Sequence, residues 1–362
     1  MFTPQDSRWM ARALQLAERG LNTATPNPRV GCVLVRDGNV VGEGWHERTG
    51  EPHAEAHALQ AAKGAARGAT AYVTLEPCSH HGRTPPCADA LIEAGVARVV
   101  AAAQDPNPQV AGQGIAKLRA AGIEVECGLM ESAARELNIG FFARMTRGTP
   151  WVRSKIAMSL DGRTALANGA SQWITGEAAR QDVQHWRARS CAVLTGIGTV
   201  LADDPQLNVR GIETSRQPLR VVVDNDLRLP PKARLLQQRG VLVYTATQDA
   251  EKIDALEQAG AVVMVLPDVN GQVDASAVLR DLAAQGCNEV LVEAGSKLNG
   301  ALLKAGLVDE LVLYLAPQLL GDMARGMARL GELTSLEQRI ELEWKDVCHV
   351  SKDLRIVARV QK

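Results

Sequence analysis

Two stretches of the sequence carry residues whose types and spacing suit chemistry at a metal ion. The first, PHAEAHALQA, contains His53 and Glu55, and the second, LEPCSHHGRTPPCADA, contains Cys78 and Cys87. One imidazole and two thiolates form a ligand set that suits zinc. A structural zinc ion takes four protein ligands, whereas a catalytic one takes three and keeps a position for water.

Glu55 favours the catalytic kind of site, because a carboxylate beside the metal can carry protons for an activated water molecule. Residues two apart on a helix point about 200° apart around its axis. His53 and Glu55 therefore converge only if the metal lies off the end of the helix, and Pro52 is consistent with a helix start there. Cys78 follows a predicted strand at the mouth of the next helix, where exposed N–H groups and the helix dipole favour a thiolate.

The sequence leaves three alternatives to an open zinc site. A fourth ligand would make the zinc structural, and the candidates are Cys32, His80 and His81. HAEAH places His53 and His57 four residues apart, as in metalloprotease helices, but Ala54 stands where that motif has glutamate. The cysteines could also be ordinary buried core residues.

The composition argues against nucleic-acid and membrane partners. A net charge of −1 and a pI of about 6.7 provide no global positive field for either. The apolar runs are far shorter than the roughly 20 residues of a membrane span, and the N-terminus lacks a signal-peptide pattern. Seven scattered cysteines favour a reducing compartment over a disulfide framework. We expect a cytoplasmic protein with small-molecule substrates, and the sequence leaves open whether it is a homo-oligomer.

Alternating helix and strand patterns predict an α/β protein of two domains, 1–147 and 148–362, divided at the Gly/Pro break in TRGTPW. In the first domain we expect a hairpin around Asp37-Gly38, helices at 6–20, 54–66, 87–94, 112–121 and 131–143, and strands at 69–76, 97–103 and 123–128. In the second we expect a closing hairpin within 338–360 and strands at 152–159, 190–195, 219–224, 240–245, 261–266, 288–293 and 308–316.

The metal motif also resembles a known family. H-x-E followed by P-C and a second cysteine is similar to the signature of zinc-dependent nucleoside and nucleobase deaminases, although here eight residues separate the cysteines instead of two. The longer PCSHHGRTPPC, together with TATPNPRVG, resembles the deaminase half of the bifunctional deaminase–reductases of riboflavin biosynthesis. RSKIAMSLDGRTA, SQWITG, HWRARSCAVLTGIGTVLADDPQLNVR and VEAG resemble the reductase half, so the resemblance covers nearly the whole chain.

The resemblance implies a fold and two reactions. The fold would be a cytidine-deaminase-like α/β/α sandwich followed by a dihydrofolate-reductase-like α/β domain. The first domain would use Zn2+ for the hydrolytic deamination of 2,5-diamino-6-(5-phosphoribosylamino)pyrimidin-4(3H)-one. The second would use NADPH to reduce the ribosyl side chain of 5-amino-6-(5-phosphoribosylamino)uracil to ribityl.

For the deaminase half, the resemblance implies Glu55 as proton carrier and three zinc ligands, His53, Cys78 and Cys87. Asn27 would read the edge of the pyrimidine, although TPNP is equally strong turn chemistry. His80 is favoured to approach the base, because it follows a ligand by two residues. The substrate phosphate needs donors, and the sequence does not choose among His46, His80, His81 and Arg83.

For the reductase half, positions carried over from the resemblance give two sets of contacts. The expected cofactor contacts are Ala157, Trp173, Thr199, Asp203, Asn225, Gly295, Ser296, Lys297, Leu298, Asn299, Gly300 and Ala301. The expected substrate contacts are Ser171, Arg187, Leu207, Arg210 and Glu293. The choice of NADPH over NADH rests on the resemblance alone.

The residues of this half also allow simpler interpretations. Gly196 and Gly198 form only a weak G-x-G pattern, but the turn at Gly295 ends a strand and opens a helix, where free N–H groups suit a phosphate. Arg187 and Arg210 suit a bidentate phosphate clamp, yet each could form a surface ion pair. Asp203 is a candidate for ring opening or proton transfer, and the alternative is a turn at a helix end.

Three classes of function therefore compete. The first is a bifunctional enzyme that acts on small molecules, and the second is a nucleic-acid deaminase, which the net charge does not favour. The third is a binding or regulatory protein with a structural zinc. Zinc analysis with ammonia release separates the first from the third, and NADPH oxidation that depends on the deaminated product separates it from the second.

Overall fold

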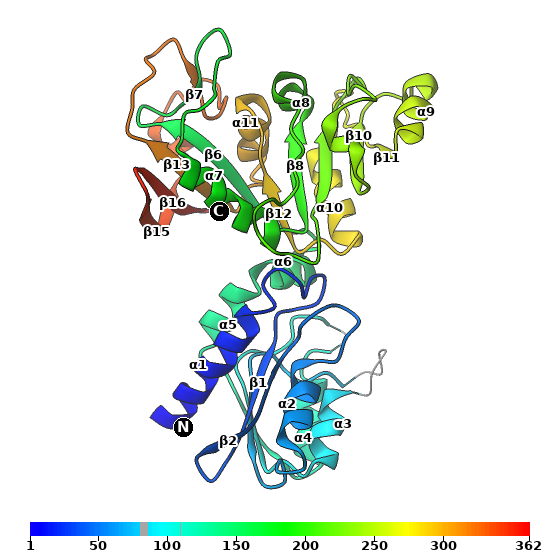
Figure 1. Ribbon diagram of the computed structural model, residues 1–362, viewed down its shortest axis with the longest axis vertical. Coiled ribbons are helices and arrows are strands. Elements are labelled where there is room, and N and C mark those ends of the chain that lie inside the picture. The colour runs from blue at the N-terminus through cyan, green and yellow to red at the C-terminus, as the bar shows by residue number, and fades with distance from the viewer. Residues whose placement is uncertain (80–85, 109) are drawn as a thin grey trace. The chain divides into compact units, whose positions relative to one another are not determined.

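The computed structural model describes residues 1–79, 86–108 and 110–362 and contains two compact units, Met1–Thr149 and Pro150–Lys362 (Figure 1). His80, His81 and Arg83, which the sequence analysis names, lie outside the described residues. Within the described part, no helix is long and apolar enough to cross a membrane.

The first unit contains a five-stranded sheet with the order β2-β1-β3-β4-β5. The strands are β1 (Gly31–Arg36), β2 (Asn39–Trp45), β3 (Thr70–Val73), β4 (Arg98–Ala101) and β5 (Glu124–Cys127). β1 is antiparallel to both of its neighbours, and β3, β4 and β5 are parallel. The expected hairpin is confirmed, because Asp37 and Gly38 both take positive φ in the turn between β1 and β2, as a type I′ turn requires.

Helices cover both faces of this sheet. One apolar cluster joins α2 (Ala54–Ala62), α3 (Cys87–Glu93) and α4 (Gln113–Ala120) to one set of strand residues. A second cluster joins α1 (Pro4–Glu18), α5 (Glu131–Leu137) and α6 (Ile139–Arg147) to the alternate set. The unit is therefore the expected α/β/α sandwich.

The helix expected at 131–143 is instead two helices, α5 and α6, which are separated at Asn138. The Asn138 side chain accepts from the Arg29 N–H at 2.7 Å and donates to the Arg29 carbonyl at 2.9 Å. This buried asparagine fixes the segment before β1 against the helix break. A contact over so many residues leaves no signal in the local periodicity that predicted one helix.

The second unit contains a nine-stranded sheet with the order β11-β10-β9-β8-β12-β6-β13-β16-β15. Its parallel strands are β6 (Trp151–Ser159), β8 (Ala192–Gly196), β9 (Leu219–Val223), β10 (Val241–Thr245), β11 (Ala261–Val265), β12 (Glu289–Val292) and β13 (Glu310–Ala316). The expected C-terminal hairpin, β15 (Leu342–Val350) and β16 (Asp353–Val360), adds two antiparallel strands. A small separate ladder pairs β7 (Arg163–Ala165) with β14 (Arg325–Gly326), and the sequence analysis missed it.

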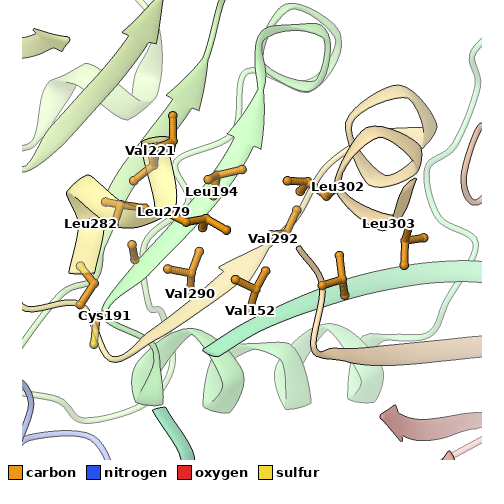
Figure 2. Close-up of a cluster of buried hydrophobic side chains, with 14 of the residues drawn as sticks. Val152, Cys191, Leu194, Val221, Leu279, Leu282, Val290, Val292, Leu302 and Leu303 are labelled. Carbon is orange, nitrogen blue, oxygen red and sulfur yellow. The ribbon is translucent and has the colours of Figure 1, made fainter. Parts of the chain in front are cut away.

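The α-helices of this unit are α7 (Glu177–Arg189), α8 (Ile197–Asp203), α9 (Ala250–Gln258), α10 (Ala275–Ala284) and α11 (Ser296–Lys304), and two short 3-10 helices are η1 (Arg234–Gln237) and η2 (Leu336–Gln338). Leu279 and Leu282 of α10 and Leu302 and Leu303 of α11 pack on the central strands in one apolar core (Figure 2). α7 packs its own cluster against Val312 and Tyr314 of β13. The neighbouring β13 residues, Leu311 and Leu313, belong to the first core, so helices cover both faces.

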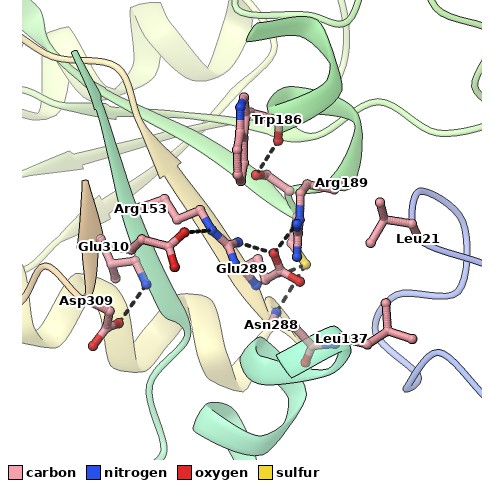
Figure 3. A network of polar contacts seen from close by, with 12 residues as sticks. Leu21, Leu137, Arg153, Trp186, Arg189, Asn288, Glu289, Asp309 and Glu310 are labelled. Atoms are coloured by element: carbon pink, nitrogen blue, oxygen red, sulfur yellow. Dashed lines mark hydrogen bonds and ion pairs between the residues drawn. The ribbon is translucent and has the colours of Figure 1, made fainter. Parts of the chain in front are cut away.

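A buried ion network joins the beginnings of three adjacent strands (Figure 3). Arg153 of β6 pairs with Glu289 of β12 and, at 2.6 Å, with Glu310 of β13. Arg189 also reaches Glu289, at 3.0 Å, and the ring of Trp186 faces both guanidinium groups. Each charge has a partner, as buried charges require. The network occupies the amino ends of these strands, so their carboxyl ends remain for other residues.

Candidate active sites

Three predicted ligands come together in the first unit. His53 directly precedes α2 in an extended conformation, Cys78 follows β3, and Cys87 is the first residue of α3. Their ligand atoms all lie within 4.8 Å of one another. The Nδ1 atom of His53 is 3.6 Å from the Sγ atom of Cys78 and 3.3 Å from that of Cys87.

These donors fit a zinc ion. Tetrahedral zinc with ordinary bond lengths separates its nitrogen and sulfur ligands by about 3.6 Å, close to both separations found here. The backbone N–H of Cys87 donates to the Sγ atom of Cys78 at 3.3 Å, so the start of α3 favours a thiolate at Cys78. The hydrogen bond from the Cys87 thiol lowers the pKa of Cys78 to about 4, and the same contact raises the pKa of Cys87.

The described residues contain no fourth member of this group. Cys32 lies in β1, fully buried in the apolar core. His57 is also outside the group, and its Nε2 atom is buried with no hydrogen-bond partner among the described residues. The metalloprotease-like arrangement of two histidines is therefore absent from the part of the chain that the structure describes.

Glu55 lies in the first turn of α2, two residues after His53, and is only 3% exposed. Burial raises the pKa of its carboxyl to about 7, while the neighbouring His53 opposes that shift. A hydrogen bond with the Cys87 side chain also lowers the pKa of this carboxyl. Glu55 therefore lies beside the three ligand atoms. The helix-end arrangement inferred for His53 and Glu55 is the one that the structure has.

Asn27 and His46 extend the same site. The Nδ2 atom of Asn27 lies 3.1 Å from the Nε2 atom of His46, whose Nδ1 atom lies 3.2 Å from the Pro52 carbonyl oxygen. The His46 ring meets the His53 ring edge to face, and its burial lowers its pKa. Both nitrogens of His46 thus have protein partners, so this histidine orients Asn27 and leaves little to offer a phosphate.

In the second unit, most of the predicted residues follow the ends of four neighbouring strands. Ala157 lies near the end of β6, Thr199 and Asp203 lie in α8 after β8, Asn225 follows β9, and Glu293 follows β12. Parallel strands end at one edge of their sheet, and ligands of such sheets bind at that edge. The structure therefore gathers these positions at the carboxyl ends of the strands, whereas the ion network lies at the amino ends.

The segment with Ser171 and Trp173 is anchored to the same edge. Gln318, just after β13, donates to the carbonyl of Ile174 at 3.0 Å. Ser171 is half-buried, and Trp173 is 68% exposed with the Arg180 guanidinium over its ring. An exposed indole at this edge is available to a ligand.

The turn after β12 is open at its beginning and packed at its end. An added Cβ atom at Gly295 would meet nothing within 4 Å, and Gly295, Ser296 and Lys297 are exposed or half-buried at the start of α11. Leu298 packs on the core, and Ala301 is exposed. Asn299 and Gly300 are buried, with the Asn299 side chain bonded to three protein groups. Phosphate contact is therefore expected from the first residues of the turn.

Arg187 and Glu293 form a buried ion pair. The Nε and Nη2 atoms of Arg187 donate to the two Glu293 oxygens at 2.6 and 3.0 Å, and its Nη1 atom donates to the Asn208 carbonyl at 2.9 Å. Burial alone would raise the pKa of Glu293, but Arg187 outweighs it and lowers this pKa to about 2. Arg187 thus forms an ion pair, as the simpler interpretation of its sequence position proposed, but the pair is buried and does not lie on the surface.

Lys155 was not singled out from the sequence. Its Nζ atom lies 3.9 Å from Glu293, and burial lowers its pKa. The available signal was a lysine within the buried strand β6. The Leu207 side chain, expected to contact substrate, packs in an apolar cluster with Val193 and Leu291. Asp203 is exposed and is the last residue of α8, and Asp204 after it is left-handed, so the segment is the helix end that was the alternative for Asp203.

The side chains of Arg210 and Asn225 are also placed. Arg210 is exposed, and one of its Nη atoms donates to Gln206 at 2.9 Å. The Asn225 amide accepts from the backbone of Val273 at 2.9 Å and bonds to Gln272. Arg210 is therefore the accessible guanidinium of the two that the sequence analysis proposed.

These features define a two-domain enzyme, in which a zinc-type hydrolytic centre is joined to an α/β domain with a ligand-binding edge. Family models match residues 3–103 to the cytidine and deoxycytidylate deaminase zinc-binding region, and residues 150–356 to the RibD C-terminal domain. The riboflavin biosynthesis protein RibD of Escherichia coli is 53% identical over 97% of this chain and 98% of its own.

Solved structures agree. The RibD of Acinetobacter baumannii has a TM-score of 0.92 and 47% identity, and the deaminase/reductase of Thermotoga maritima has 0.88 and 36%, each covering 99% of both chains. The chain belongs to the RibD family. It is a bifunctional deaminase and reductase of riboflavin biosynthesis that uses zinc and NADPH, as the sequence analysis expected.

Proposed function

We propose that the first unit deaminates 2,5-diamino-6-(5-phosphoribosylamino)pyrimidin-4(3H)-one at its 2-amino group, with His53, Cys78 and Cys87 as the zinc ligands. The observation that supports this most is the close approach of the three donor atoms beside the buried Glu55. Zinc bound there supplies the Lewis acidity that makes water a nucleophile near neutral pH.

Glu55 carries the protons of this reaction. It takes one from the attacking water, passes it to a ring nitrogen of the pyrimidine, and delivers a proton to the amino group, which leaves as ammonia while the ring carbon gains oxygen. Asn27, held by His46, reads the pyrimidine edge with its amide oxygen, which has no hydrogen-bond partner among the described residues.

The test is the Glu55→Ala variant. We expect it to keep one zinc per chain, by metal analysis, and to release ammonia at least a hundredfold more slowly, because the proton carrier is gone. The matched control is Glu51→Ala, an exposed carboxylate just before His53. Normal ammonia release by Glu55→Ala would refute the proton role, and loss of zinc would move Glu55 into the metal shell.

The second unit, in our proposal, reduces C1′ of the open ribosyl chain of 5-amino-6-(5-phosphoribosylamino)uracil. NADPH supplies the hydride when bound. The N–H groups at the start of α11, from Gly295 to Lys297, suit the cofactor's phosphates. The other expected cofactor contacts lie at the same carboxyl ends of the strands: the exposed Trp173, and also Ala157, Thr199, Asp203 and Asn225. Ser171 and Glu293 contact the substrate, and Arg210 binds its phosphate. Arg187 keeps Glu293 ionised and in place.

A further inference from the structure

Glu76 is a buried acid that the reactions described above do not use. It is 4% exposed, and the ion pairs formed within the described residues include none of its own. Its carboxylate accepts three backbone N–H groups instead. The Oε2 atom accepts from Asp105 at 3.2 Å and from Gly112 at 2.9 Å, and the Oε1 atom accepts from Ile115 at 3.1 Å.

Two of these N–H groups belong to the beginning of α4. Gly112 is the N-cap residue of that helix, and it has no side chain to cap the free N–H groups of the first turn. Glu76 accepts from the N-cap residue and from Ile115, the third residue of the helix. A carboxylate from a distant segment therefore does the work that a local capping residue usually does, next to the positive end of the helix dipole.

The same contact holds the turn that carries Cys78. Only Pro77 separates Glu76 from Cys78, and α4 packs directly on Pro77: a Cβ atom added at Gly114 would lie 1.9 Å from the Pro77 carbonyl oxygen. On its other side, the Cys78 carbonyl accepts from Ala88 of α3 at 3.1 Å. The cysteine is thus held between α4, through Glu76 and Pro77, and α3.

We propose that Glu76 is a positioning residue of the zinc centre, which keeps the Cys78 thiolate where it meets His53 and Cys87. This inference rests on the zinc site of the proposed function. The carboxylate acts through the backbone of the turn and touches neither metal nor substrate. Without it the first turn of α4 loses its acceptor, Pro77 loses its support, and Cys78 samples positions farther from the other two ligands.

The test compares zinc release from the full chain with Glu76→Gln, which keeps the size of the side chain but puts an NH2 group against an N–H donor. The probe is the rate of zinc transfer to a colorimetric chelator. We expect release to be about tenfold faster or more, in the range typical for residues that support metal ligands. Glu76→Asp keeps the charge on a shorter side chain, so its rate of zinc release should fall between those of the parent protein and Glu76→Gln. It provides a second variant if Glu76→Gln folds poorly.

The control is Asp6→Asn, which weakens the same unit elsewhere. Asp6 caps α1 through Thr3 and bonds to Arg98 and to the Tyr72 hydroxyl of β3, and among the described residues it has no hydrogen bond or ion pair with residues 74–79. We expect Asp6→Asn to lower the unfolding temperature without faster zinc release. Unchanged release in both Glu76 variants, or equal acceleration in Asp6→Asn, would overturn the positioning role alone. A parent protein that holds no zinc would overturn the proposed metal site and this inference together.

Discussion

The charge of Glu293 depends mainly on Arg187, with smaller contributions from Lys155 and Arg210. Because the pKa of Glu293 is about 2 in the folded chain and ordinarily 4.5, its ionisation stabilises the fold fully above about pH 4.5, and this contribution is lost as the pH falls toward 2. Glu293→Gln should remove this part of the pH dependence, which is on the order of 3 kcal/mol. The measurement is the free energy of unfolding between pH 7 and pH 3, over which about 2 kcal/mol of this contribution is lost.

The control for this prediction is Glu332→Gln, an exposed carboxyl of the same unit. Its unfolding free energy should follow the parent protein at every pH. If the parent and Glu293→Gln lost stability in parallel between pH 5 and pH 3, the ion pair with Arg187 would not be what holds the carboxylate ionised.

Arg210 is the exposed guanidinium at the reductase site, whereas every donor group of Arg187 has a protein partner. Arg210→Ala should raise the KM of the phosphorylated substrate by tenfold to a hundredfold, roughly the value of a hydrogen bond to a charged group. The KM of the dephosphorylated compound should stay unchanged, as should both values in Arg239→Ala, an exposed arginine of the same unit. Equal KM changes for the two substrates would remove Arg210 from the phosphate site.

At the level of residues, the sequence predicts what depends on chemical type. A histidine, a glutamate and two cysteines in this order restrict the chemistry so strongly that the metal group could be named before any geometry. The pairing of Arg187 with Glu293, the position of Lys155 beside them and the partnership of His46 with Asn27 could not be named. Each joins segments far apart in the chain, and no local pattern records it.

At the level of helices and strands, steric constraints decide which substitutions the fold tolerates. Two helical glycines show opposite cases. A Cβ atom at Gly300 in α11 would lie 2.3 Å from the Arg329 carbonyl oxygen, whereas one at Gly198 in α8 would meet nothing within 4 Å. Gly300→Ala should therefore lower the unfolding free energy by about 1–3 kcal/mol through overpacking. Gly198→Ala should be neutral or stabilising by up to about 1 kcal/mol, through helix propensity.

Thermal and denaturant unfolding of both variants measures this difference, and an NADPH titration of Gly300→Ala should show weaker binding because α11 carries the open turn. A Gly300→Ala protein as stable as the parent would show that the segment around Arg329 can move away at little cost.

Most elements of the chain could be predicted because their period is local. The strands of the second unit appear within a residue or two of their expected limits, since buried parallel strands read as short apolar runs between turn signals. The helix break at Asn138 and the β7–β14 ladder were missed. The first depends on hydrogen bonds to Arg29, and the second joins two short segments about 160 residues apart.

At the level of the whole molecule, each unit has apolar cores of its own. The clusters around α2 and α1 contain only residues of the first unit, and those around α10, α11 and α7 contain only residues of the second. A unit with its own core can in principle keep its fold when the other is perturbed. Zinc is bound by residues of the first unit in our proposal, so its removal should act on that unit.

Chelation of zinc from the full chain should therefore abolish ammonia release and leave NADPH oxidation with the deaminated substrate within about twofold of the parent rate. Calorimetry should show the deaminase transition moving to lower temperature, because a ligand that binds only the folded state stabilises it by mass action. The temperature of the reductase transition should stay unchanged. Adding zinc back should restore ammonia release and the temperature of the deaminase transition. Loss of NADPH oxidation on chelation, recovered with zinc, would mean that the second unit depends on the metal of the first.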